Sequence, residues 1–164
     1  MEKIYGIKER QDCLMRVGQS KWILFYGFGK DDETSDTGWE FRHTFNYKPH
    51  LSEIKELVIS AINSFTSDKI VKGFVWNNQP VYLSIENQLN YAAIERCKDI
   101  QFPLVLKINE QVDGTPIYQT FENAEDFHVF SQAIAMHITE TVQKGWYEKD
   151  NVDWSAFTIN DIEI

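Results

Sequence analysis

Cysteine is scarce in this chain of 164 residues, which contains only Cys13 and Cys97. Secreted domains that depend on disulfides carry far more, so both thiols are interpreted as reduced. Long apolar runs are also missing, and the first residues, Met1–Gly6, lack the apolar core of a signal peptide. We therefore expect a cytoplasmic protein with no membrane partner.

Basic residues are also few, with 16 Lys and Arg against 25 Asp and Glu, a formal net charge of −9. This charge repels a phosphate backbone, and the basic residues form no run, so nucleic-acid binding is disfavoured. A protein partner with a basic surface is still possible at this net charge. Hydrophobic residues make up 43% of the chain and charged residues 25%, which is typical of a folded globular protein. Length and composition predict one domain over residues 1–164, with 1–20 and 147–164 as peripheral segments.

Three hairpin–helix units are predicted along the chain. Apolar or alternating runs bounded by turn formers predict strand pairs, and apolar residues every three or four positions predict helices. The expected strands are 21–28 with 39–47, 73–76 with 81–83, and 102–108 with 117–121. Helices follow from Leu51, from an N-cap at Ser84 to near Asp99, and from Asn123 to a terminating Gly145.

The helix after Ser84 is expected to bury one apolar face, made by Ile85, Leu89, Ala92, Ala93 and Cys97. Trp154 and Phe157 are expected to pack the tail back onto the domain. The whole is predicted to be an α+β fold with an antiparallel sheet of about six strands and the helices on one face.

Local motifs for catalysis, cofactors or metals do not survive inspection. Gly27-Phe28-Gly29-Lys30 resembles a phosphate loop, but Asp31 replaces the required Ser or Thr and no helix is predicted to follow. The acids of the next loop do not have the spacing of a calcium loop. His128 and His137, nine residues apart, point to opposite sides of a helix. We predict no catalytic, cofactor-binding or metal-binding residue.

Aromatic residues are plentiful, with 5 Trp, 7 Tyr and 11 Phe. Helices on one face leave the other face of the sheet uncovered, and Tyr26, Tyr47, Tyr82 and Tyr118 are candidates for a surface there. Such a face is either solvated or meets a partner, and the sequence leaves both open.

Residues 72–154 resemble a small domain of unknown function encoded in bacteriophage and prophage genomes, often near tail genes. The similarity lies in the segment Lys72–Arg96, with its Gly73-Phe74 strand, Asn77-Asn78 turn, Ser84 and Glu86-Asn87-Gln88. Thr120-Phe121-Glu122, Gly145-Trp146 and Asp153-Trp154 are further pieces of the same pattern. The resemblance implies a phage-related protein of a bacterial cytoplasm or a virion, and it brings no reaction or cofactor.

The leading hypothesis is a noncatalytic structural or assembly accessory protein that acts through protein contacts, with a protein partner or with itself. The alternative is a module that binds a small ligand or a peptide on an aromatic sheet face. A third hypothesis is an enzyme whose residues converge only in space, with Glu86, His43 or Cys97 as candidates.

Overall fold

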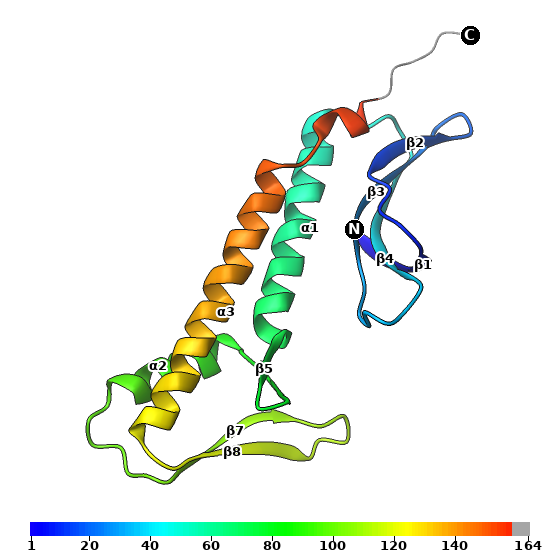
Figure 1. Cartoon of the computed structure of the whole chain (residues 1–164). Helices are drawn as coiled ribbons and strands as arrows, with labels where there is room; N and C mark the ends of the chain where they lie inside the picture. Colours follow the sequence, from blue (N-terminus) through cyan, green and yellow to red (C-terminus); the bar gives the residue numbers. More distant parts are fainter. Residues whose placement is uncertain (159–164) are drawn as a thin grey trace. The chain divides into compact units, whose positions relative to one another are not determined.

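The structure is a computed structural model that describes residues 1–158 (Figure 1). Its contacts group into two compact units, whereas the sequence predicts one domain. Unit 1 comprises Met1–Asn63 and the chain from Glu148 onward, and unit 2 is Ser64–Tyr147. Both boundaries fall inside long helices, α1 (Leu51–Lys72) and α3 (Ala124–Asp150). Within the described residues, no helix has the length and apolar character needed to cross a membrane.

Unit 1 contains a four-stranded antiparallel sheet with the order β1-β4-β3-β2. Its central strands, β3 (Lys21–Gly29) and β4 (Gly38–Phe45), confirm the first predicted hairpin. The edge strands are β1 (Glu2–Ile7) and β2 (Cys13–Val17). Both come from the segment that the sequence analysis treated as peripheral.

The first part of α1 covers one face of this sheet (Figure 1). Every second residue of β3 from Trp22 to Tyr26 points to that face and is buried, as strand alternation requires. They pack against the α1 residues Ile54, Val58, Ala61 and Ile62. The carboxylate of Glu53 accepts a 2.8 Å hydrogen bond from the backbone N–H of His50 and so caps the start of α1.

The tail of unit 1 folds back up to Thr158, as the sequence predicts, and residues 159–164 of the predicted peripheral segment lie outside the described residues. A short 3-10 helix, η1 (Trp154–Phe157), places Phe157 in the core of the unit, with Trp154 packed against that core. The side chain of Asp153 caps η1 by accepting a hydrogen bond from the backbone N–H of Ser155, 3.0 Å away.

Apart from the end of α1, unit 2 contains two separate hairpins and two helices. The hairpins are β5 (Phe74–Trp76) with β6 (Gln79–Val81), and β7 (Leu104–Glu110) with β8 (Pro116–Phe121). Asn77 and Asn78 both have positive φ, the conformation that a tight two-residue turn demands. Ser84 caps α2 (Ile85–Arg96), and Asn123 caps α3 through a 3.0 Å bond from the N–H of Asp126. The predicted Asn77-Asn78 turn and the predicted helix starts at Ser84 and Asn123 are confirmed.

Phe130 lies at the centre of the unit 2 core and is fully buried. Its ring has five aromatic neighbours at centroid distances from 5.0 to 6.1 Å, namely Phe74, Trp76, Tyr91, Phe121 and Phe127. Each hairpin and each helix of the unit therefore contributes a ring to one cluster.

The prediction of one sheet with about six strands is wrong, because the structure has one four-stranded sheet and two separate two-stranded hairpins. Between the two hairpins of unit 2, one backbone bond runs from the N–H of Tyr82 to the carbonyl of Ile108, at 2.9 Å. The carbonyls of Tyr82 and Leu83 accept instead from the side-chain amides of Asn87 and Gln88. A carbonyl bound by a side chain is not free to extend a ladder.

The predicted end of the last helix at Gly145 is also wrong, since α3 continues to Asp150. Gly145 is buried, and a Cβ atom there would lie 2.5 Å from the Oγ1 atom of Thr66 on α1. The residue is a glycine because two helices approach closely at this point, and not because a helix ends there.

Replacing Gly145 by Ala should therefore destabilise the protein by about 1–2 kcal/mol, because overpacking outweighs the gain in helix propensity. Chemical denaturation measures this change. The double variant Gly145→Ala/Thr66→Ala removes the colliding side chain and should recover part of the loss. A Gly145→Ala protein as stable as the wild type would contradict the proposed close approach.

Candidate functional site

The four tyrosines predicted to share a sheet face do not share one. Tyr26 is only 3% exposed and lies in the core of unit 1, where its hydroxyl donates a 2.8 Å hydrogen bond to Glu148. Tyr47 is exposed after β4, and its hydroxyl donates to Glu53 at 2.6 Å. Tyr82 and Tyr118 are exposed residues of unit 2. The expected aromatic platform does not form, since no single sheet carries all four.

Tyr82 and Tyr118 are nevertheless associated with the same strand of unit 2. Tyr82 lines a hollow of about 530 Å³ next to β7, and Lys107 of β7 lines it too. Tyr118 of β8 is the cross-strand partner of Lys107. The sequence analysis named both tyrosines but not the hollow, because the separation of the two hairpins that opens it involves pairing between distant segments.

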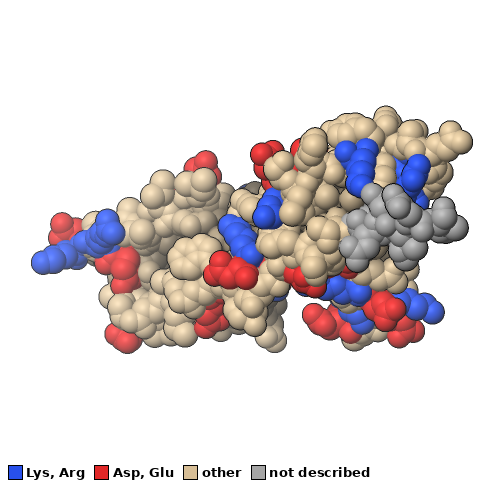
Figure 2. All heavy atoms as spheres, turned by 90° about the horizontal axis from the view of Figure 1, so that it is seen from above, with Lys and Arg blue, Asp and Glu red and all other residues tan. Residues whose placement is uncertain are grey.

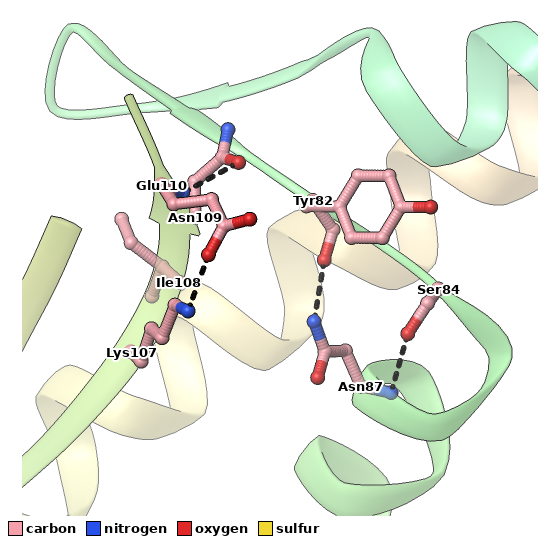
Figure 3. Close-up of a pocket in the computed structure, with 7 residues that line it drawn as sticks. All are labelled: Tyr82, Ser84, Asn87, Lys107, Ile108, Asn109 and Glu110. Carbon is pink, nitrogen blue, oxygen red and sulfur yellow. Dashed lines mark hydrogen bonds and ion pairs between the residues drawn. The ribbon is translucent and has the colours of Figure 1, made fainter. Parts of the chain in front are cut away.

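The hollow lies where β6 runs into α2, opposite the end of β7 (Figure 3). On one wall, the Ser84 hydroxyl accepts a 3.2 Å bond from the Asn87 N–H, and the Asn87 side chain donates to the Tyr82 carbonyl at 2.8 Å. On the other, Lys107 and Glu110 form a 2.6 Å ion pair. Asn109 donates to the Pro80 carbonyl at 3.1 Å and so bridges the two hairpins.

These groups give the hollow donors and acceptors together with one aromatic ring. Lys107 and Glu110 are both about half exposed, so their pairing is weak and either is open to a polar ligand. Ser84, Asn87 and Asn109 are held by backbone contacts. The arrangement can hold a small polar group or an extended peptide.

The outer face of α2 is the largest departure from the sequence analysis in this unit. Tyr91 is the only buried residue of the helix, although the predicted core face was a different one. Ile85 and Leu89 are 71% and 66% exposed, and Ala92, Ala93 and Cys97 are exposed as well. Ile85 and Leu89 lie one helical turn apart and form a continuous apolar strip. We call these two residues and the two alanines the α2 outer face.

A second hollow, of about 280 Å³, brings Cys97 near a histidine that the sequence analysis did not assign to it. Glu95, Cys97, Phe102 and His128 are among its lining residues. His128 Nδ1 contacts the Glu95 carboxylate, and this hydrogen bond, followed by the charges of Glu95 and Glu125, raises the pKa of His128. Glu95 lies in the last turn of α2 and His128 near the start of α3, so the pair ties the two helices together.

The residues considered for a dispersed active site belong to different units or to opposite ends of one helix. His43 belongs to unit 1, where its ring packs edge-on against Phe45 at a centroid distance of 4.6 Å. Glu86 lies at the start of α2, where hydrogen bonds from its own N–H and from Ser84 lower its pKa. Cys97 follows the other end of the same helix. Glu86 therefore acts in a helix cap.

The glycine-rich segment of β3 also has a structural explanation. A Cβ atom on Gly29 would collide with the ring of Trp39, 2.2 Å away, so the glycine makes room for that ring. Asp31 accepts bonds from Lys3, Tyr5 and Trp39. Over residues 1–158, no three His, Cys, Asp or Glu side chains are grouped so as to hold a metal ion.

In unit 1, several charged side chains pair with one another instead of facing solvent alone. Arg10 donates to Asp12 at 2.8 Å and to Glu148 at 2.7 Å, and its guanidinium lies over the ring of Tyr26. Although burial opposes ionisation, the bonds from Arg10 and Tyr26 hold the pKa of Glu148 below its usual value. This network joins β3 to the end of α3 within the unit and leaves none of these four side chains free for a ligand.

Charges of both signs are interspersed on the face drawn in Figure 2. Small groups of blue and red atoms lie there, in places next to one another, among larger uncharged areas, and the atoms drawn in grey are left aside. This face offers no continuous basic area of the kind that binds a phosphate backbone.

Comparisons with known proteins give no match from which a function could be argued. No protein-family model, curated protein or solved structure matches it significantly. A function must therefore be argued from the surfaces and hollows of the two units themselves.

The contact between Glu95 and His128 gives a measurable pH dependence. We expect NMR titration to place the pKa of His128 above its usual value of about 6.5. Because folding raises this pKa, the pair stabilises the protein below about pH 6.5 and loses this effect as pH rises through the folded pKa. Glu95→Gln should lower the pKa clearly, and Glu125→Gln should lower it less. An unchanged pKa in Glu95→Gln would refute the pairing.

Proposed function

We propose that this protein is a noncatalytic accessory or assembly protein of the bacteriophage or prophage type, acting through protein–protein contacts in a bacterial cytoplasm or on a virion. The observation that carries the contact role is the α2 outer face, which is apolar, exposed and held in a fixed helix. An amphipathic helix normally buries its apolar side, whereas the apolar side of α2 is exposed in this unit.

The strip supplies part of the free energy that binding needs. Fully burying an Ile or Leu side chain contributes about 1.5–3 kcal/mol, and Ile85 and Leu89 are 71% and 66% exposed, so covering both adds about 2–4 kcal/mol before the costs of association. The helix is already ordered from its inner side by the Ser84 cap, the bond from Gln88 to the Leu83 carbonyl, and the buried Tyr91. A partner therefore meets a preformed surface, which lowers the entropy lost on binding.

The phage-type assignment is supported by the resemblance alone. Its most specific segment, residues 72–96, forms the β5–β6 hairpin, the Ser84 cap and α2. The segment that resembles phage-encoded domains therefore includes the helix that carries the exposed face.

The alternative function is the binding of a small polar ligand or a peptide, and the hollow at Tyr82 favours it. Ile85 and Leu89 do not line that hollow, so substitutions on the α2 outer face leave its walls in place. The two functions are therefore separable by mutation.

Affinity capture tests the proposed contact. The immobilised protein is exposed to a lysate of prophage-induced bacteria, and retained proteins are identified by mass spectrometry. We expect a phage structural protein to be retained by the wild type and by the control Val112→Asp, which alters an exposed loop residue. The Ile85→Asp/Leu89→Asp variant should retain at least ~10-fold less, because the charges prevent burial of the strip.

Two outcomes would count against the proposal. If the wild type retains no phage structural protein, the phage-type role is wrong. If the double variant retains as much as Val112→Asp, the α2 outer face is not the contact surface. Circular dichroism of each variant checks that the fold is intact, which is expected because all three positions are exposed.

A further inference from the structure

Strand β8 has an open edge. Among residues 1–158 it pairs with β7 alone, and β7 lies between β8 and the β5–β6 hairpin (Figure 1). The side of β8 away from β7 therefore presents backbone groups with no neighbouring strand, which is the usual template for pairing with another chain.

Hydrogen bonds near the end of β8 show which residues point to the open edge. The Thr120 carbonyl accepts a 2.8 Å bond from the side-chain amide of Gln119, and the Glu122 N–H donates to Asp126 at 3.3 Å. Side chains, and not β7, therefore partner the backbone at positions 120 and 122. Because strand residues alternate, Tyr118 directs its N–H and carbonyl to the same edge.

The middle of this edge, between Pro116 and Phe121, lacks the usual protection. β8 reads Pro-Ile-Tyr-Gln-Thr-Phe, with no charged residue and with a proline only at its first position. The edge strands of unit 1 are protected, since β1 contains Glu2, Lys3 and a bulge, and β2 contains Arg16. Native proteins block exposed edges with charges, prolines and bulges, so an uncharged edge of high strand propensity points to a partner.

We propose that β8 pairs with β8 of a second copy of this chain, antiparallel and about a two-fold axis, to join two hairpins into one four-stranded sheet. The second copy is the occupant because it presents an edge that is already ordered, uncharged and self-complementary under two-fold symmetry. A foreign segment would first have to lose conformational entropy to match it.

The register follows from the groups available at the edge. Pro116 has no N–H, and the N–H of Glu122 is bound to Asp126, so Tyr118 and Thr120 are the residues of this edge that can use both an N–H and a carbonyl. Placing the axis at Gln119 sets Tyr118 of each copy opposite Thr120 of the other. Each facing pair then exchanges two hydrogen bonds, once the Thr120 carbonyl gives up its bond to the Gln119 side chain.

The side chains suit this register. Tyr118 is 60% exposed, and an aromatic residue opposite a β-branched threonine is a favourable cross-strand pair. The two Gln119 side chains face one another at the axis, next to a hollow of about 290 Å³ that Gln119 lines with Trp76 and Val129. The Gln119 amide then releases the Thr120 carbonyl to an N–H of the second copy.

This interface does not rest on the proposed phage-type function. It uses β8, whereas the partner contact proposed above uses the α2 outer face, and the two surfaces share no residue. Either can fail while the other holds.

Disulfide trapping tests the register in the full chain, with Cys13 and Cys97 replaced by Ser. Residues facing each other at a position without hydrogen bonds have Cα atoms about 4.5 Å apart, within disulfide reach. Gln119→Cys should form a covalent dimer of twice 19.2 kDa under mild oxidation. Val112→Cys, an exposed control in the loop before β8, should cross-link at least ~10-fold more slowly.

Sedimentation provides an independent test without cysteine chemistry. We expect the wild type and Gln119→Thr to dimerise across the micromolar range. Gln119→Lys places two ammonium groups face to face and should weaken dimerisation ~10-fold or more. A wild type that stays at 19.2 kDa throughout that range would overturn the proposal. Equal cross-linking of the two cysteine variants, or equal dimerisation of Gln119→Lys, would also overturn it.

Discussion

Side-chain amides that bind backbone carbonyls determine the form of unit 2. Asn87 and Gln88 hold the carbonyls of Tyr82 and Leu83, just after β6. A carbonyl bound by a side chain is less available to a neighbouring strand. The two hairpins are instead linked by single bonds, from the N–H of Tyr82 to the carbonyl of Ile108 and from the Asn109 side chain to the carbonyl of Pro80. A hollow lies between them, and β8 is left as an outer strand.

The sequence predicts local structure well because local structure depends on neighbouring residues. Ser84 and Asn123 cap helices, and Asn77 and Asn78 adopt positive φ, all as their chemistry requires. Strand order was not predictable, since it depends on contacts between distant segments, such as Tyr82 with Ile108. Gly145 was misinterpreted because a glycine that terminates a helix and one that admits a neighbouring helix look the same in one sequence.

The candidate site was predictable only in its parts. Tyr82 and Tyr118 were named for their aromatic character, but Tyr26 turned out to be buried. The face of α2 was misassigned because Ile85 and Leu89 follow the helical period of a core-facing strip, while the helix docks through Tyr91. A strip of apolar residues on a helix predicts that the strip is buried. It does not show whether the burying surface belongs to the same chain or to a partner.

The two surfaces of unit 2 have a common physical origin. Burial of Phe130 and its ring neighbours stabilises the inner sides of the helices and hairpins, and leaves apolar side chains on α2 and β8 outside. Unit 1 differs, since Arg10, Asp12, Tyr26 and Glu148 satisfy one another. The chemistry of the described residues thus favours binding through unit 2. A partner would contact the α2 outer face or the edge of β8, which are already folded.

Amide hydrogen exchange along β8, followed as a function of protein concentration, tests most directly whether the open edge of this unit is a binding surface. If a second copy covers that edge, the amides of Tyr118 and Thr120 become protected as concentration rises, whereas those of Ile117 and Gln119, which face β7, change little. Rapid exchange of Tyr118 and Thr120 at every concentration would contradict the account.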